Sequence, residues 1–224
     1  MYKLSPSDFA YLWEDCKYCY YQKIKNGISY SGIFPAMFGK INGLLQSSIM
    51  GMDISDIIPG HPSGIVTVEE GFLRSKIIPG TNVYLSGRFD ILTKLTDGSY
   101  GLIDFKITTP DEEKILKKYT SQLHAYKFAL ENPTEGSPIK ISTMGAVSIH
   151  PDEMKLVNGR VQFTATPTYH PIKENMDEFL KLMKEISDFL NGPAPAEGEN
   201  CSLCNYRAKF RPDVSKPIED GLPF

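Results

Sequence analysis

The sequence has no excess of basic residues: 24 Lys and Arg stand against 27 Asp and Glu, so the net charge is −3 at pH 7. This charge excludes a general electrostatic attraction for nucleic acid, and any such contact would need a local basic patch. A run of 18 apolar residues is also absent, which argues against a membrane-spanning helix. Hydrophobic residues still make up 41% of the 224 residues, as in ordinary globular proteins with a sizeable core.

Cysteine is scarce, and the four that occur form two CxxC pairs, Cys16/Cys19 and Cys201/Cys204. Acidic residues interrupt the N-terminal stretch, which therefore lacks the apolar centre of a signal peptide. We accordingly expect a cytoplasmic protein without a membrane partner. In that reducing compartment, paired cysteines are more typical of metal ligands than of disulfides.

The spacing of apolar residues and turn signals predicts an α/β protein. Asp97-Gly98 is typical of a tight turn between two strands, so the central strands should form an antiparallel meander. Gly39 and Gly43 should interrupt the second helix. The expected helices cover 4–27, 34–52, 111–132 and 172–192, and the expected strands cover 65–78, 82–95, 99–108 and 139–149, followed by a hairpin within 157–170.

Two neighbouring strands carry charged residues: Asp90 lies in one, and Asp104 and Lys106 lie in the next. Side chains alternate along a strand, so Asp104 and Lys106 share a face. If the strands pair across the turn, Asp104 lies near residue 91 and thus beside Asp90. Adjacent carboxylates repel, and a hard cation such as magnesium allows both to stay ionised. The alternative is a structural Asp–Lys ion pair, with the second aspartate at a solvent edge.

The helix that follows adds two polar residues. Gln122 and Tyr126 are four positions apart and hence lie on one helical face. A helix that directly follows a strand tends to pack back against the sheet. Both side chains should therefore point towards the aspartates.

The order and spacing of these motifs resemble the PD-(D/E)XK nuclease superfamily and, more narrowly, its RecB-like branch with a QxxxY motif. The motifs are Gly87-Arg88-Phe89-Asp90, Asp104-Phe105-Lys106, Tyr119 and Gln122-x-x-x-Tyr126. The flanks SPSDFAYLWEDCKYCYY and CSLCNYR are similar to those of the iron–sulfur members, such as the CRISPR-associated exonucleases and the AddB nuclease domain. The resemblance implies a restriction-endonuclease-like core, with a central mixed sheet flanked by helices.

The resemblance also implies a function: a DNA exonuclease, dependent on Mg²⁺ or Mn²⁺, that acts on single-stranded or end-bearing DNA in repair or CRISPR-type processing. A helicase or integrase partner would follow by analogy. A bound metal ion would activate water and neutralise charge at phosphorus. The implied metal ligands are Asp90, Asp104 and the Phe105 carbonyl, with Lys106 acting on a water and Gln122 and Tyr126 positioning the phosphate or the lysine.

Asn42 departs from the family pattern, because it stands where the RecB-like exonucleases usually carry a metal-binding histidine. An asparagine oxygen can bind a metal, but it is a poorer ligand, so activity could be weaker or favour manganese. The alternative function is accordingly a weak or inactive nucleic-acid-binding or scaffold protein of the same fold. His124 lies on another face of its helix, where a surface or core role is the simpler interpretation.

The two CxxC pairs could share one metal centre if the chain ends meet, as they do in the family. Four thiolates suit zinc or an iron–sulfur cluster. Spacing alone favours zinc, whereas the resemblance favours a four-iron four-sulfur cluster, which we expect here. The whole chain would be one domain with a core over about 30–191, a cysteine clamp formed by 1–29 and 192–210, and a loose tail over 211–224.

Local groups of lysines offer candidate contacts with nucleic acid. Lys114, Lys117 and Lys118 precede Gln122, and further lysines share the first helix with tyrosines that could stack on bases. The alternative is a solvated helix face.

Overall fold

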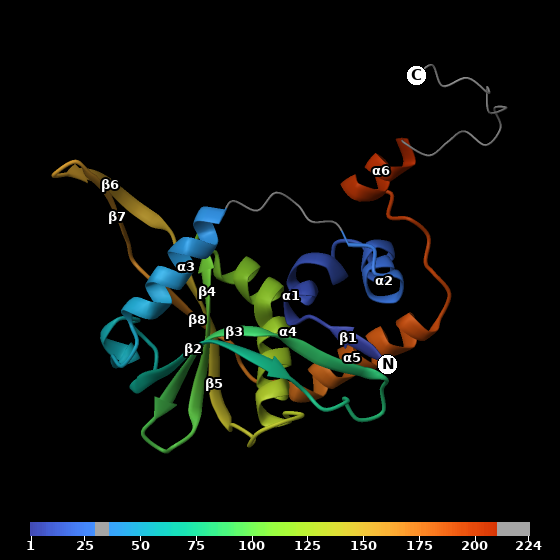
Figure 1. Ribbon diagram of the computed structural model, residues 1–224, viewed down its shortest axis with the longest axis horizontal. Coiled ribbons are helices and arrows are strands. Elements are labelled where there is room, and N and C mark those ends of the chain that lie inside the picture. Colours follow the sequence, from blue (N-terminus) through green and yellow to red (C-terminus); the bar gives the residue numbers. More distant parts are fainter. Residues whose placement is uncertain (30–35, 210–224) are drawn as a thin grey trace, which may run out of the picture.

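The computed structural model describes residues 1–29 and 36–209, which gather around one mixed β-sheet (Figure 1). Its six strands are β1 (Tyr2–Leu4), β2 (Gly64–Arg74), β3 (Val83–Leu95), β4 (Tyr100–Ile107), β5 (Ile141–Ile149) and β8 (Thr168–Pro171). Their order is β1-β3-β4-β5-β8, and β2 pairs with β3. Two pairs are parallel, β1 with β3 and β4 with β5, and the other neighbours are antiparallel. The predicted α/β class with a central mixed sheet is confirmed.

Side chains from the two faces of the sheet form two hydrophobic cores. The longer helices are α3 (Ala36–Ser48), α4 (Glu112–Glu131) and α5 (Met176–Asn191). On one face, α4 and α5 contribute Leu123 and Met183 to a core that also includes Leu102 of β4. On the other face, the segment after α3 places Ile54 against Ile103 of β4. The sheet therefore lies between two layers, with α4 and α5 packed on one face.

The predicted meander of β2, β3 and β4 is present. Asp97 caps the β3–β4 turn by accepting hydrogen bonds from the Ser99 backbone N–H and hydroxyl at 2.9 and 2.6 Å. Gly98 has a φ of 82°, a left-handed conformation that glycine adopts without strain. The turn fixes the register, which pairs Ile91 with Ile103. By continuation, Asp90 lies opposite Asp104.

The predicted helix over 4–27 is not continuous. It divides into α1 (Pro6–Asp8), the π-helical turn η1 (Phe9–Trp13) and α2 (Lys17–Asn26). Cys16 has φ −160° and ψ 106°, an extended conformation that breaks the helix, and its Sγ caps α2 by accepting the N–H of Cys19. The first CxxC pair therefore begins a helix, whereas the predicted helix over 4–27 would have included both cysteines.

The second predicted helix also differs from expectation, because α3 continues through Gly39 and Gly43 without a break. Residues 30–35 and the predicted loose tail over 211–224 lie outside the described residues. The predicted hairpin is present as β6 (Pro151–Val157) and β7 (Arg160–Ala165). A short helix not predicted from the sequence, α6 (Ser202–Lys209), begins directly after Cys201 and includes Cys204. Over the described ranges, we find no helix long and apolar enough to cross a membrane.

Candidate functional site

The candidate site lies where β3 and β4 part. Their pairing ends at Ile91 and Ile103, although both strands continue beyond this point. The Asp90 carboxylate accepts the Phe105 backbone N–H at 2.8 Å. The Asp90 side chain thereby takes the place of a backbone carbonyl from a neighbouring strand as the hydrogen-bond acceptor for this N–H. This contact opens the sheet and directs a carboxylate into the gap.

Asp104 is buried, with 2% of its surface exposed, and is held from two sides. Its Oδ2 forms an ion pair with the Lys106 ammonium, which lies on the same side of β4. Its Oδ1 accepts a hydrogen bond from Gln122 Nε2 at 3.3 Å. Burial opposes the charge of Lys106, but the carboxylates of Asp104 and Asp90 raise its pKa above its usual value. Lys106 is therefore protonated in this arrangement.

Helix α4 positions Gln122 and Tyr126. The helix begins at the Asp111 cap, whose carboxylate accepts the Lys114 N–H, and it packs against the sheet. Besides contacting Asp104, Gln122 donates through Nε2 to the Tyr126 hydroxyl at 2.9 Å. Burial, aided by the nearby Asp104 charge, raises the Tyr126 pKa, so this phenol stays neutral. The two residues predicted to face the aspartates thus lie beside them.

The two carboxylates of the aspartate pair both lie near one ammonium, that of Lys106. Burial, and after it the neighbouring Asp104 carboxylate, raise the pKa of Asp90, which lies at about 7. Lys106, the Phe105 N–H and a hydrogen bond from the Asn42 amide act in the opposite direction. Two buried acceptor oxygens, Asn42 Oδ1 and Gln122 Oε1, have no hydrogen-bond partner among the residues that the structure describes. Carboxylate and amide oxygens that lack hydrogen-bond donors are suitable ligands for a hard divalent cation.

A cavity of about 260 Å³ opens beside these residues, and its wall includes Asn42, Lys106, Tyr119 and Tyr11. Tyr11 comes from η1 and its hydroxyl lies 3.0 Å from that of Tyr119. Lys118 Nζ lies 4.1 Å from the centroid of the Tyr11 ring, and Lys106 Nζ lies 4.5 Å from that of Tyr119. The sequence analysis did not single out Tyr11, because nothing in its local spacing distinguishes it from the other tyrosines nearby.

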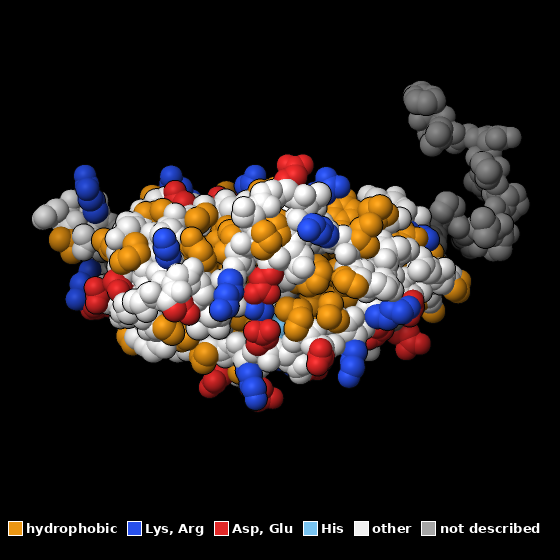
Figure 2. Space-filling view, turned by 90° about the horizontal axis from the view of Figure 1, so that it is seen from below, with side chains coloured by type: hydrophobic (Ala, Val, Ile, Leu, Met, Phe, Trp, Pro, Cys, Tyr) orange, Lys and Arg blue, Asp and Glu red, His pale blue; other side chains and the backbone are white. Residues whose placement is uncertain are grey.

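Of the three lysines predicted to contact nucleic acid, Lys118 lies against the ring of Tyr11, which lines this cavity. Lys114 forms an ion pair with Asp111, and Lys117 is exposed on α4. Of the tyrosines on the first helix that could stack on bases, Tyr20 and Tyr21 are buried in the core, whereas Tyr18 is half-buried. On the face shown in Figure 2, basic and acidic side chains are interspersed, without one continuous basic surface.

His124 has a structural role, as the simpler interpretation held. It is 1% exposed, its Nδ1 lies 2.8 Å from the Thr120 carbonyl oxygen, and its Nε2 accepts the Asn175 N–H at 2.8 Å. Both ring nitrogens therefore have partners. The helix cap of α5 is tied to α4 through this histidine.

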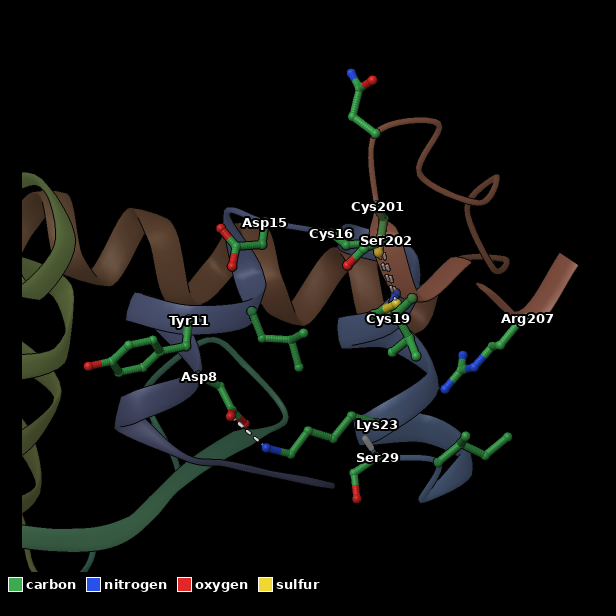
Figure 3. Close-up of a pocket in the computed structure, with 14 residues that line it drawn as sticks. Asp8, Tyr11, Asp15, Cys16, Cys19, Lys23, Ser29, Cys201, Ser202 and Arg207 are labelled. Atoms are coloured by element: carbon green, nitrogen blue, oxygen red, sulfur yellow. Dashed lines mark hydrogen bonds and ion pairs between the residues drawn. The ribbon is translucent and has the colours of Figure 1, made fainter. Parts of the chain in front are cut away.

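The four cysteines meet where α2 and α6 adjoin, and Figure 3 shows three of them, Cys16, Cys19 and Cys201, close together. They are free thiols, and their sulfur atoms all lie within 4.8 Å of one another, a grouping that can hold a metal ion. Burial and contacts with the other sulfurs raise the pKa of Cys19. Burial also opposes ionisation of Cys201, but hydrogen bonds from the Cys204 backbone and neighbouring thiols lower its pKa to about 7. Four thiolates this close need a cation.

Comparison with known proteins agrees with this geometry, because residues 53–209 match the PD-(D/E)XK nuclease superfamily. The chain belongs to this superfamily. Its members are nucleases that use divalent metals. The crystal structure of SSO0001 has a similar fold, with a TM-score of 0.51 and 15% sequence identity over 92% of this chain and 84% of that chain. No curated protein matches the chain significantly.

Proposed function

We propose that the protein is a divalent-metal-dependent deoxyribonuclease of the RecB-like branch, with Gln122 and Tyr126 as its QxxxY motif. It would hydrolyse phosphodiester bonds as an exonuclease on single-stranded or end-bearing DNA, in repair or CRISPR-type processing. The observation that carries this proposal is the opposition of Asp90 and Asp104 where β3 and β4 part, with Lys106 and Gln122 in contact with Asp104.

Asp90, Asp104 and the Phe105 carbonyl would hold Mg²⁺ or Mn²⁺. A bound ion of this kind supplies an activated water at neutral pH and neutralises charge on the phosphate. The fit rests on the raised pKa of Asp90 and on the Asn42 side-chain oxygen, which has no hydrogen-bond partner within the described part of the chain and could act as a further ligand. Gln122 would keep the Asp104 carboxylate in one orientation, and Tyr126 would fix the Gln122 amide.

Lys106 would orient a water or contact a phosphate oxygen. Its raised pKa means that it keeps its proton, so a donor role is supported better than that of a general base. Its ammonium also lies against the Tyr119 ring, which limits where the side chain can move. A cation bound at Asp104 would compete with Lys106 for that carboxylate and leave the ammonium available to the substrate.

The surroundings of Tyr11 support a single-stranded substrate. The cavity of about 260 Å³ beside Asn42 and Lys106 and a second of about 520 Å³ at the cysteines both include Tyr11 in their walls. Lys23 and Arg207 line the second cavity. Aromatic rings interleaved with cations bind single strands by stacking on bases and contacting phosphates. We infer that a strand would pass Tyr11 on its way to the aspartates.

The proposal is tested by incubating end-labelled single- and double-stranded DNA with the full chain in Mg²⁺, Mn²⁺ or EDTA. We expect metal-dependent shortening that Asp104→Asn and Lys106→Ala abolish. Lys184→Ala is the matched control, because Lys184 is an exposed lysine on α5 paired with Asp188. Equal inactivity of all proteins on every substrate would contradict the proposal.

Asn42 supports one other candidate, a weak or inactive binding protein of the same fold. Its amide faces Asp90 as a hydrogen-bond donor, and the resemblance to the RecB-like branch implies a metal-binding histidine at this position. In that case the same DNA would bind without being cleaved, and a helicase or integrase partner would supply the activity. Binding measured alongside cleavage separates the two functions.

A further inference from the structure

We propose that the four-cysteine cluster binds a single tetrahedral zinc-type ion, in place of the four-iron four-sulfur cluster that the resemblance implies. The site joins Cys16 and Cys19 at the start of α2 to Cys201 and Cys204 around the start of α6. It is separate from the aspartates. The inference therefore concerns a second metal centre and stands whether or not the protein cleaves DNA.

The separations between sulfur atoms carry the inference. They are 3.8 Å for Cys16 and Cys204, 3.6 Å for Cys19 and Cys204, and 3.7 Å for Cys19 and Cys201. Zinc binds four thiolates tetrahedrally at a Zn–S distance of about 2.3 Å, and the edges of such a tetrahedron are about 3.8 Å long. The three distances link all four sulfur atoms, and each agrees with the edge of a tetrahedron around one central ion.

A four-iron cluster does not fit this arrangement. Each of its cysteines binds a different iron of an iron–sulfide cube, so the cube separates the thiolates from one another. Here every pair of sulfurs lies within 4.8 Å, which leaves no room for a cube between them. Gly198 closes the site from outside, since a Cβ at this position would lie 3.1 Å from both Cys16 Sγ and Cys201 Cβ. Expansion of the site would have to displace this backbone.

The surroundings of the sulfurs are those of a structural site. Cys16 Sγ accepts the Cys19 backbone N–H at 3.4 Å, a contact that stabilises a thiolate. Three of the four cysteines are buried, and Leu12, Tyr18 and Leu203 pack around them. A closed set of four protein ligands leaves no position for water or substrate, so the ion would take no part in catalysis.

The ion would attach the end of the chain to its beginning. The ligand pairs are separated by 182 to 188 positions in sequence. Figure 1 shows α6 next to α2 and away from the sheet. Cys204 is the one buried residue of α6, so its sulfur anchors this helix to the cysteine cluster. Loss of the ion should release α6, and with it Arg207, from the cavity that Tyr11 shares.

Metal analysis of the full chain tests the inference. The protein would be purified anaerobically from cells supplied with both zinc and iron, and zinc, iron and inorganic sulfide would be measured. We expect about one zinc per chain, no sulfide and a colourless protein. Iron and sulfide in equal, four-fold amounts, with the broad visible absorption of a cluster, would overturn the inference. So would a folded protein without stoichiometric metal.

Cobalt then reports the geometry directly. Replacing the ion by Co²⁺ should give the intense visible bands of tetrahedral cobalt with thiolate ligands, and a weak octahedral spectrum would contradict the inference. Cys201→Ala should lose stoichiometric metal. Cys201 is the least buried of the four ligands, so its replacement disturbs packing least. Ser202→Ala is the matched control and should keep the ion. Stoichiometric zinc in Cys201→Ala would also overturn the inference.

Discussion

The Phe105 backbone N–H donates to Asp90 Oδ2 at 2.8 Å, so a carboxylate replaces a strand as the partner of this backbone group. The bond holds Asp90 opposite Asp104 on the neighbouring strand. It also explains why the β3–β4 pairing stops at Ile91 and Ile103. The local opening of the sheet and the carboxylate pair therefore have one cause.

Asp90 should make the stability of the metal-free protein depend on pH. Folding raises its pKa from 3.8 to about 7, so the folded protein holds this proton more tightly than the unfolded chain does. The contribution is fully present below about pH 4 and is lost as pH rises through about 7. The free energy of unfolding, measured with denaturant in EDTA, should therefore fall between these values. Asp90→Asn should show a smaller fall, and an identical pH profile in the variant would refute the assignment.

Gln122 should affect the rate of cleavage more than the stability. Gln122→Leu fills a similar volume but removes the donor to Asp104 Oδ1, and we expect single-turnover cleavage to slow by about 10²-fold. Tyr126→Phe removes only the hydroxyl that accepts from Gln122, so a loss of about tenfold is expected. The control is Thr120→Val, which changes a hydroxyl on the same helix that binds the Leu116 carbonyl. Cleavage by Gln122→Leu at the wild-type rate would argue against this role.

Tyr11 should contribute to binding of a single strand. Tyr11→Ala removes the ring beside Lys118, and loss of one stacked base, worth about 1–3 kcal/mol, would weaken binding roughly ten- to hundred-fold. Tyr11→Phe keeps the ring and should bind nearly as well. Anisotropy with labelled oligonucleotides, in a Lys106→Ala background that prevents cleavage, measures the dissociation constants. Phe72→Ala is the control, because Phe72 is 70% exposed on β2 outside both cavities. Equal binding by Tyr11→Ala and wild type would exclude the proposed path.

The parts of the fold that depend on local sequence could be predicted. Alternating apolar residues and the Asp97-Gly98 turn gave the β3–β4 hairpin to within one residue of its observed register. The spacing of Gln122 and Tyr126 sufficed to place both beside Asp104, since helix period and register are both short-range properties.

Features that depend on distant contacts could not be predicted. The break at Cys16 arises because its sulfur caps α2 and meets Cys204, which lies 188 positions away. Tyr11 belongs to the site through its contact with Tyr119, 108 positions away, and its local sequence gives no sign of this. The choice between zinc and an iron–sulfur cluster likewise depends on separations between sulfur atoms, which spacing in the sequence does not determine.

Asn42 offers a test in which function should be gained. Its side chain reaches Asp90, and its oxygen has no partner among the described residues. Asn42→His would supply an imidazole nitrogen, which binds Mn²⁺ better than Mg²⁺. We expect the manganese concentration that gives half-maximal cleavage to fall by about tenfold, with a smaller change for magnesium.

The matched variant for this experiment is Asn42→Ala, which removes the amide and adds no ligand. It should need more of either metal, and it should also raise the pKa of Asp90 further, because a hydrogen bond that favours the carboxylate is lost. Its pH–rate profile would then shift to higher pH than that of the wild type. If Asn42→His and Asn42→Ala had the same metal dependence as the wild type, Asn42 would lie outside the metal site, and its contact with Asp90 would serve only to hold α3 against the sheet.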